Sequence, residues 1–236
     1  MEVLTKSSKR QIIATSGGFS IEPRNKRLDR YILAQVAAQT PKICFIPTAS
    51  GDSKNYIKRF YNFFEKENCI CSHLQLFKGN FDDLNSFLLQ QDILYIGGGN
   101  TKNMLVLWKE WGIDQILRQA YQKGILLCGI SAGSLCWFEQ GLSDAIPNKL
   151  TTLNCLGFIE GSNCPFFNAE VKRETYKTML QNQQIMEGIA TEMGVGLHYE
   201  NEYLTKVISS RKSAKAYQYS LQNNMLVEKI LRPIYL

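Results

Sequence analysis

Short apolar segments alternate with longer amphipathic segments along the N-terminal part of this 236-residue chain. The apolar segments have the length and hydrophobicity of strands buried on both faces. They are Gln11–Thr15, Lys42–Ile46, Ile70–Phe77, Asp92–Ile96 and Ile125–Cys128. Strands and helices that alternate at this spacing predict a mostly parallel sheet with helices on both faces, a three-layer α/β sandwich.

The segments between these strands carry apolar residues at helical spacing. The expected helices are Leu28–Ala38, Tyr56–Lys66, Asp83–Leu89, Met104–Trp108 and Ile113–Tyr121, and a further helix is expected after Gly133. From about Leu153 the pattern changes to short strands joined by turns. These are Val195–Leu197, Leu204–Ser209, Ala216–Ser220 and Met225–Leu231, and they predict antiparallel strands added at one edge of the sheet. Because no linker interrupts the pattern, we expect one domain over residues 1–236.

The composition excludes several classes of protein. Apolar residues make up 44% of the chain, too many for a disordered protein. Lys and Arg number 27 against 21 Asp and Glu, and this mild, scattered excess does not predict nucleic-acid binding. No apolar run approaches 18 residues, and the polar start, Met1–Arg10, lacks the apolar part of a secretory signal. We therefore expect a cytoplasmic protein without a membrane or nucleic-acid partner.

The seven cysteines form no paired CxxC framework, and Cys44, Cys128 and Cys136 lie within apolar stretches. This pattern is typical of reduced, buried thiols in a cytosolic protein. Cys69, Cys71 and His73 would share one face of a strand. Since a fourth ligand is not evident and the spacing matches no common zinc pattern, we expect no metal there.

A tight turn flanked by glycines, Gly129-Ile130-Ser131-Ala132-Gly133, follows an apolar strand. Such a turn between a strand and a helix forces its central residue into a strained backbone conformation, and it presents the Ser131 hydroxyl above the sheet edge. The N–H of Ala132 can then help to stabilise an oxyanion. The sequence predicts a nucleophilic Ser131; the alternative is a tight turn in which Ser131 only caps the helix.

A second glycine-rich turn, Gly97–Gly99 followed by Asn100 and Thr101, also ends a strand. Three glycines allow the backbone to approach a ligand closely and to offer it N–H groups. A flexible turn or a phosphate cradle would have the same composition. Because no Gly-Lys-Ser/Thr follows, a nucleotide-binding P-loop is disfavoured.

Several stretches together resemble the peptidase E (dipeptidase E, aspartyl dipeptidase) family of S51-type serine peptidases. The matching stretches are GGFSIEP (17–23), LDRYIL (28–33), PKICFIPTASGDS (41–53), IGGGNT (96–101), GISAGSLCWFE (129–139), GVGLHY (194–199), SSR (209–211) and AY (216–217). The resemblance implies a fold like that of class I glutamine amidotransferases (flavodoxin-like), with Ser in place of their Cys. It also implies a cofactor-free hydrolase of small peptides, often those with an N-terminal acidic residue.

Carried over position by position, the resemblance implies Ser131 as the nucleophile. The N–H groups of Gly99 and Ala132 would form the oxyanion hole. Asp144 and Glu192 both match acidic positions that are assigned to the catalytic group in members of the family, and which of the two orients the base stays open.

Substrate binding is assigned to Asn100 in the glycine-rich turn and to Arg173. The family places basic residues at the spacing of Arg173, so its guanidinium could pair with a substrate carboxylate. A solvated surface charge is the alternative for Arg173.

The expected base is missing. The family has a Pro-His-Tyr or Pro-His-Phe turn, and here the matching His position holds Phe166. The chain has only two histidines, of which His73 belongs to an early strand and His198 to the GVGLHY stretch. His198 could substitute as the base, or Lys172 could activate Ser131 in a Ser–Lys arrangement.

The sequence therefore predicts a serine peptidase acting on small peptides through an acyl-enzyme at Ser131, with activity impaired by the missing His. The alternatives are a catalytically degenerate homologue that binds peptides or a partner, and an amidase or glutaminase. The last would ordinarily use a Cys nucleophile, and Cys128 lies three residues too early. The antiparallel edge strands could form a homodimer surface.

Overall fold

The computed structural model describes residues 9–79 and 82–236. The expectation for the polar start of the chain therefore falls largely outside the described residues. Within the described part, no helix combines the length and the hydrophobicity needed to cross a membrane.

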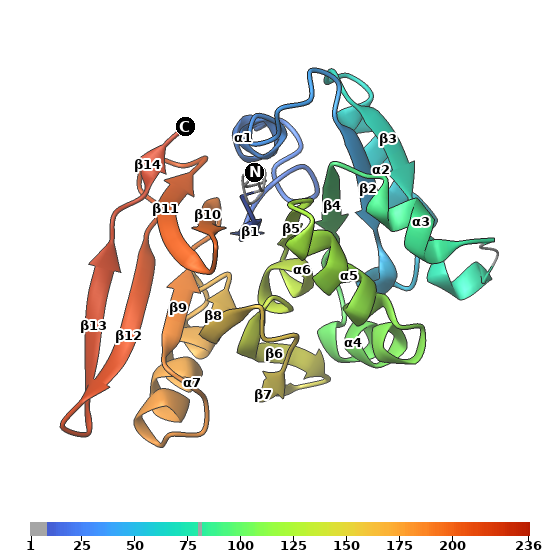
Figure 1. The fold of residues 1–236 in the computed structure, drawn as a ribbon. Helices are drawn as coiled ribbons and strands as arrows, with labels where there is room; N and C mark the ends of the chain where they lie inside the picture. Colours follow the sequence, from blue (N-terminus) through green and yellow to red (C-terminus); the bar gives the residue numbers. More distant parts are fainter. Residues whose placement is uncertain (1–8, 80–81) are drawn as a thin grey trace, which may run out of the picture.

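The central sheet has eight strands in the order β14-β11-β10-β1-β5-β4-β2-β3 (Figure 1). They are β1 (Gln11–Thr15), β2 (Lys42–Ile46), β3 (Ile70–His73), β4 (Ile93–Ile96), β5 (Leu126–Ile130), β10 (Val195–Glu200), β11 (Tyr203–Ser209) and β14 (Ile234–Tyr235). The strands from β1 to β3 in this order are parallel, whereas β10 pairs antiparallel with β1 and with β11. This arrangement confirms a mostly parallel sheet extended by antiparallel strands from the C-terminal part.

Helices cover both faces of this sheet, because the side chains of its buried strands alternate between two apolar layers. Ile13, Phe45 and Tyr95 face α1 (Arg27–Leu33) and α2 (Lys54–Phe64). Ile12, Ile46 and Leu94 lie in the opposite layer, with α3 (Leu84–Leu89), α4 (Thr101–Glu110) and α5 (Ile113–Gln122). The three-layer sandwich expected from the sequence is thus confirmed.

A second sheet of six strands lies beside the first, in the order β13-β12-β9-β8-β6-β7. Its strands are β6 (Phe138–Ile146), β7 (Lys149–Asn154), β8 (Ile159–Pro165), β9 (Gly188–Thr191), β12 (Ala216–Gln222) and β13 (Met225–Leu231). The helix α7 (Glu170–Gln181) packs on it through the buried side chains of Tyr176 and Leu180. Two of its strands, β12 and β13, were expected from the sequence, but at the edge of the central sheet, whereas the structure places them in this second sheet. A separate sheet was not predicted, and the helix expected after Gly133 is only the short α6 (Ala132–Leu135), which leads directly into β6.

Two expected elements are shorter than predicted. The strand from Ile70 ends at His73, and the chain continues in a 3-10 turn, η2 (Leu76–Lys78), similar to η1 (Thr48–Ser50) earlier in the chain. The helix expected to reach Ala38 ends at Leu33, where the side-chain amide of Gln35 donates to the carbonyl of Tyr31 and satisfies one of the terminal acceptors.

Candidate active site

Ser131 occupies a strained backbone position between β5 and α6. Its φ is 59° and its ψ is −111°, a region that side chains other than glycine rarely adopt. Although Ser131 is the N-cap residue of α6, its side chain makes no capping hydrogen bond. The alternative of a serine that only caps the helix is therefore wrong. The main-chain N–H of Ser131 instead donates to the carbonyl of Thr15 in β1, at 3.2 Å.

The glycines on either side of Ser131 are required by close packing. A Cβ on Gly129 would lie 2.5 Å from the carbonyl oxygen of Gly133 and 2.7 Å from that of Ile96. A Cβ on Gly133 would also overlap the carbonyl oxygen of Ile96. Because no larger residue fits at either position, the sharp turn from β5 into α6 can form only with this sequence pattern.

The glycine-rich turn after β4 lies directly against Ser131. A Cβ on Gly98 would be 3.1 Å from the Cβ of Ser131 and 3.6 Å from its Oγ. Gly99 has a φ of +143°, and a Cβ there would overlap the carbonyl group of Ala49. The two sequence motifs therefore meet at the carboxyl ends of β4 and β5, the edge where open α/β sheets bind their ligands.

A cavity of about 210 Å³ opens beside the Ser131 hydroxyl. It is small, with room for a side chain or a short peptide rather than for a large ligand. Its lining comes from the loop after β1, from α2, from the two motif turns and from the turn after β8. The residues are Ser20, Ile21, Tyr56, Arg59, Gly98, Gly99, Ile130, Ser131 and Phe166.

The family model of peptidase family S51 matches residues 12–207, which include both turns and the turn after β8. The chain belongs to peptidase family S51. It is 48% identical over 229 residues to the uncharacterized peptidase YgaJ of Bacillus subtilis, covering 96% of this chain and 99% of that protein. It is also 29% identical over 162 residues to the uncharacterized peptidase PM1590 of Pasteurella multocida, covering 62% of this chain and 78% of that protein.

Solved structures of peptidases share this fold at low sequence identity. A peptidase from an acI-B1 Actinobacterium superposes with a TM-score of 0.70 at 15% identity, covering 96% of both chains. A structure assigned to peptidase E from Listeria monocytogenes gives a TM-score of 0.63 at 20% identity, covering 87% of this chain and all of that one. The resemblance to the peptidase E family is confirmed, and the protein is by family a peptidase.

Two residues that line the Ser131 cavity were not predicted from the sequence. Tyr56 and Arg59, both on α2, lie one turn apart on the same helix face, so that helical spacing could have grouped them. The Tyr56 hydroxyl donates to Ser20 Oγ at 3.0 Å and accepts from the N–H of Gly98 at 3.2 Å. The guanidinium of Arg59 lies 4.9 Å from the centre of the Tyr56 ring, and the side chain is exposed.

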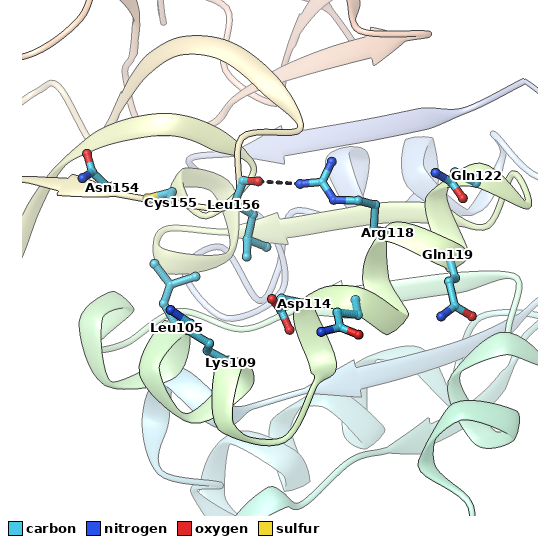
Figure 2. A pocket seen from close by; sticks show the side chains of 10 residues that line it. Leu105, Lys109, Asp114, Arg118, Gln119, Gln122, Asn154, Cys155 and Leu156 are labelled. Carbon is cyan, nitrogen blue, oxygen red and sulfur yellow. Dashed lines mark hydrogen bonds between the residues drawn. The ribbon is translucent and has the colours of Figure 1, made fainter.

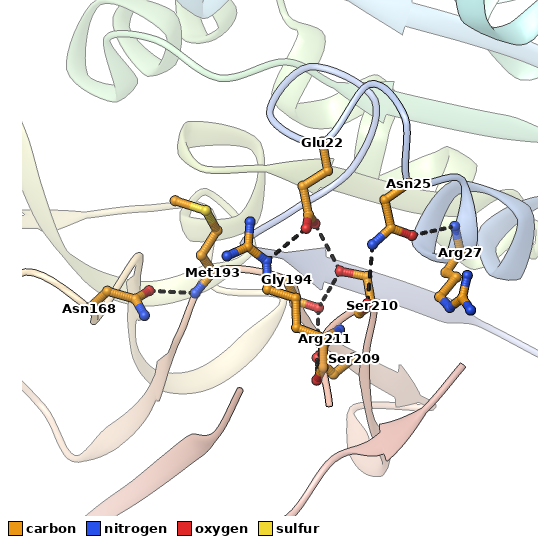
Figure 3. A network of polar contacts seen from close by, with 9 residues as sticks. All are labelled: Glu22, Asn25, Arg27, Asn168, Met193, Gly194, Ser209, Ser210 and Arg211. Carbon is orange, nitrogen blue, oxygen red and sulfur yellow. Dashed lines mark hydrogen bonds and ion pairs between the residues drawn. The ribbon is translucent and has the colours of Figure 1, made fainter. Parts of the chain in front are cut away.

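A polar network fixes the loop that carries Ser20 and Ile21 (Figure 3). The carboxylate of Glu22 is buried, and it accepts from Arg211 Nε and from Ser210 Oγ, both at 2.8 Å. Asn25 donates to the carbonyl of Ser210 at 3.1 Å. The end of β11 thus holds the loop after β1 in position over the cavity.

Phe166 lies in the same cavity as Ser131. Its φ is +60°, which is unusual for an aromatic residue, and its N–H donates to Ser16 Oγ at 3.3 Å. Phe166, at the position where the family resemblance implies a histidine, therefore borders the Ser131 cavity.

His198 does not lie in this cavity, contrary to its suggested role as a substitute base. It is fully buried in β10, opposite Ile13 of β1. Its Nδ1 lies 2.8 Å from the Tyr31 hydroxyl and its Nε2 lies 3.1 Å from Gln11 Oε1. Burial lowers the pKa of His198 to about 4, so that the ring is neutral near pH 7. The other histidine, His73, bonds through Nδ1 to the Tyr61 hydroxyl at 2.8 Å.

The two residues Asp144 and Lys172 pair with each other. Lys172 Nζ lies 3.3 Å from Asp144 Oδ2, and the Asp144 side chain is 68% exposed. Neither residue lines the Ser131 cavity; both border a separate surface hollow between β6 and α7. The geometry supports neither a Ser–Lys pair with Ser131 nor a carboxylate next to it at position 144.

Glu192 and Arg173 are likewise joined to each other. Arg173 Nη2 donates to Glu192 Oε1 at 2.7 Å, and its Nε donates to the carbonyl of Phe167 at 2.6 Å. The Tyr217 hydroxyl donates to the same Glu192 oxygen at 2.9 Å. The guanidinium of Arg173 is therefore already occupied by a carboxylate of the protein, and it does not line the cavity where substrate binding was expected.

Asn100 acts within the fold rather than in the cavity. Its Oδ1 accepts from the N–H of Asn103 and caps α4, while its Nδ2 donates to the carbonyl of Ala145 at 2.9 Å. With both ends of the amide engaged, Asn100 ties the glycine-rich turn to β6. The substrate-binding role expected for Asn100 finds no support in this arrangement.

A larger hollow of about 560 Å³ lies on the α4–α5 surface (Figure 2). It shares no residue with the Ser131 cavity, and its lining mixes apolar side chains with charged ones, among them Lys109, Asp114 and Arg118. Arg118 donates to the carbonyl of Leu156 at 2.7 Å, across the hollow from α5 to the segment after β7. Its lining includes the thiol of Cys155, whose pKa is raised to about 12 by burial, so that it is protonated near pH 7.

Proposed function

We propose that this family S51 protein is a serine-type peptidase whose acyl-transfer site is Ser131. The observation that carries the proposal is the strained backbone of Ser131, whose side chain makes no capping hydrogen bond. Its hydroxyl borders a cavity next to Gly98 and Gly99. A serine in this geometry can attack a peptide carbonyl and form an acyl-enzyme. The N–H groups of Gly99 and Ala132 are the proposed donors to the oxyanion, because Gly99 lines the Ser131 cavity and Ala132 directly follows Ser131 in the chain.

The substrates proposed are small peptides with an acidic residue on the acyl side. The cavity is too small for a folded protein segment, and its wall carries the exposed guanidinium of Arg59. Arg59 has no carboxylate partner among the ion pairs of the described residues, in contrast to Arg173. A carboxylate of the substrate would therefore find in Arg59 a cation with donors in fork geometry.

A second candidate is a peptide-binding homologue that does not turn over its ligand. The observation that favours it is Phe166, since an apolar ring cannot accept the proton that Ser131 must lose. A positioned general base contributes on the order of 10²–10⁴ in rate, so its loss leaves only the slow reaction that the oxyanion hole supports.

Labelling by a fluorophosphonate tests the nucleophile. A peptidase with an activated Ser131 should be labelled at that residue, and the Ser131→Ala variant should stay unlabelled. The Ser134→Ala variant is a matched control, because Ser134 lies one turn further along α6 and is fully buried. If folded protein is not labelled but still binds aspartyl dipeptides in calorimetry, the peptide-binding candidate replaces the peptidase. Release of ammonia from glutamine would instead indicate an amidase.

A further inference from the structure

Two thiols lie in contact on the surface, away from the Ser131 cavity. The Sγ atoms of Cys69 and Cys71 are 3.9 Å apart, at the start of β3. All seven cysteines are free, and four of them, Cys44, Cys128, Cys136 and Cys164, are buried. Cys69 and Cys71 are only partly buried, and β3 is the outermost strand of the central sheet, so solvent reaches this pair.

The backbone at this point allows the two sulfurs to come together. Residues two positions apart have Cα atoms at most about 7 Å apart, close to the range that disulfides span. The chain bends just before β3, where the N–H of Cys69 donates to the carbonyl of Glu67. No group of three or more His, Cys, Asp or Glu side chains suited to a metal occurs in the described part of the chain, so the chemistry of the pair is that of a dithiol.

We propose that Cys69 and Cys71 form a reversible intrachain disulfide when the protein meets a small-molecule disulfide such as oxidised glutathione. The thiolate of Cys69 attacks one sulfur of the oxidant, and a mixed disulfide forms as the first glutathione leaves. The thiolate of Cys71 then attacks the Cys69 sulfur and releases the second glutathione. The two cysteines are oxidised by two electrons and lose two protons, and the oxidant is reduced to two thiols.

The environment of the pair indicates which thiol reacts first. The two sulfurs share a hydrogen bond, and this contact lowers the pKa of Cys69. The same contact raises the pKa of Cys71, so that Cys71 loses its proton and attacks only after Cys69 has been converted to the mixed disulfide. Cys155 offers a comparison, because it is also partly buried but bonds only to the carbonyl of Leu153, and burial raises its pKa to about 12.

Thiol trapping across a series of glutathione redox buffers tests this proposal on the folded chain. Aliquots are alkylated with iodoacetamide, digested and examined by mass spectrometry. As the buffer becomes more oxidising, alkylation of Cys69 and Cys71 should be lost together, and their common peptide should lack two hydrogen atoms. Alkylation of Cys155 should not change over the same range, and reduction should restore both labels.

Single variants separate pairing from independent oxidation. Cys71→Ser should accumulate a stable glutathione adduct on Cys69, because the second attack is lost, whereas the wild-type protein should not retain it. Cys155→Ser should behave as the wild type does. The proposal is overturned if the wild-type protein accumulates the Cys69 adduct to the same level as Cys71→Ser, or if both thiols stay alkylated in the most oxidising buffer.

Discussion

Replacing Phe166 with histidine places an imidazole in the cavity that holds the Ser131 hydroxyl. The substitution suits the backbone, because histidine adopts positive φ values more readily than phenylalanine does. The N–H bond from position 166 to Ser16 involves only the main chain at that position and stays available. Since Phe166 is only partly buried, the loss of apolar burial should destabilise the protein by about 1 kcal/mol, and the variant should fold.

The size of the expected gain follows from what surrounds position 166. A positioned general base contributes about 10²–10⁴ in rate. The upper end needs a carboxylate that orients the imidazole, and loss of that carboxylate costs about 10⁴ in a Ser-His-Asp peptidase. Here Glu192 is bound by Arg173 and Tyr217, and Asp144 by Lys172. We therefore expect Phe166→His to raise kcat/KM about a hundredfold, equivalent to about 2.7 kcal/mol in the activation free energy.

The assay is hydrolysis of a chromogenic aspartyl anilide, with kcat/KM measured from pH 5 to pH 9. The gained activity should rise as pH passes about 6.5, where an imidazole loses its proton. Phe166→Gln is the matched control, since it removes the ring without supplying a base, and the added change Ser131→Ala should abolish the gain. The reasoning is refuted if folded Phe166→His gains nothing, or if Phe166→Gln gains as much.

Three further outcomes are expected. Arg59→Ala should weaken the protection of Ser131 from fluorophosphonate by aspartyl peptides about tenfold, the loss of one charge-assisted contact, and should leave protection by uncharged peptides unchanged. Gly99→Ala should lower Tm by several degrees, because its Cβ would overlap Ala49. Gly112→Ala is the control: it also has a positive φ but open space around it, and its free energy of unfolding should fall by only about 1 kcal/mol. His198 has a folded pKa below that of the free side chain, so its contribution is complete above about pH 6.5 and is lost as pH falls towards 4. Denaturant titrations should show the free energy of unfolding of the wild type falling by up to about 3 kcal/mol towards pH 4, and that of His198→Gln should not show this fall. The same dependence on pH in both proteins would contradict the neutral, buried ring.

The central sheet could be predicted because its strands are buried on both faces. In Lys42–Ile46, for example, the four residues after Lys42 are all apolar and all buried, the pattern of a short strand covered on both faces. The second sheet has no such signal. The strand β6 shows no regular alternation of buried and exposed residues and directly follows the short α6, so its local pattern was ambiguous.

The backbone parts of the site were predictable, and the side-chain pairings were not. Ser131 and the glycines around it form one local motif. This motif contacts the Gly97–Gly99 turn because β4 and β5 are adjacent parallel strands that end at the same edge of the sheet. The partners of Glu192 and Arg173 depend instead on how α7 packs against β9 and β12, which no local spacing reveals. Long charged side chains reach several partners, and the tertiary arrangement decides among them.

The bend at Ser131 is enforced by the tight packing of Gly129 and Gly133 against Ile96, and none of these residues takes part in proton transfer. The strained backbone of Ser131 therefore costs the fold the same conformational energy whether or not an imidazole faces the hydroxyl. If Ser131 is the nucleophile that we propose, a change at position 166 should alter its reactivity and leave the turn that holds it unchanged.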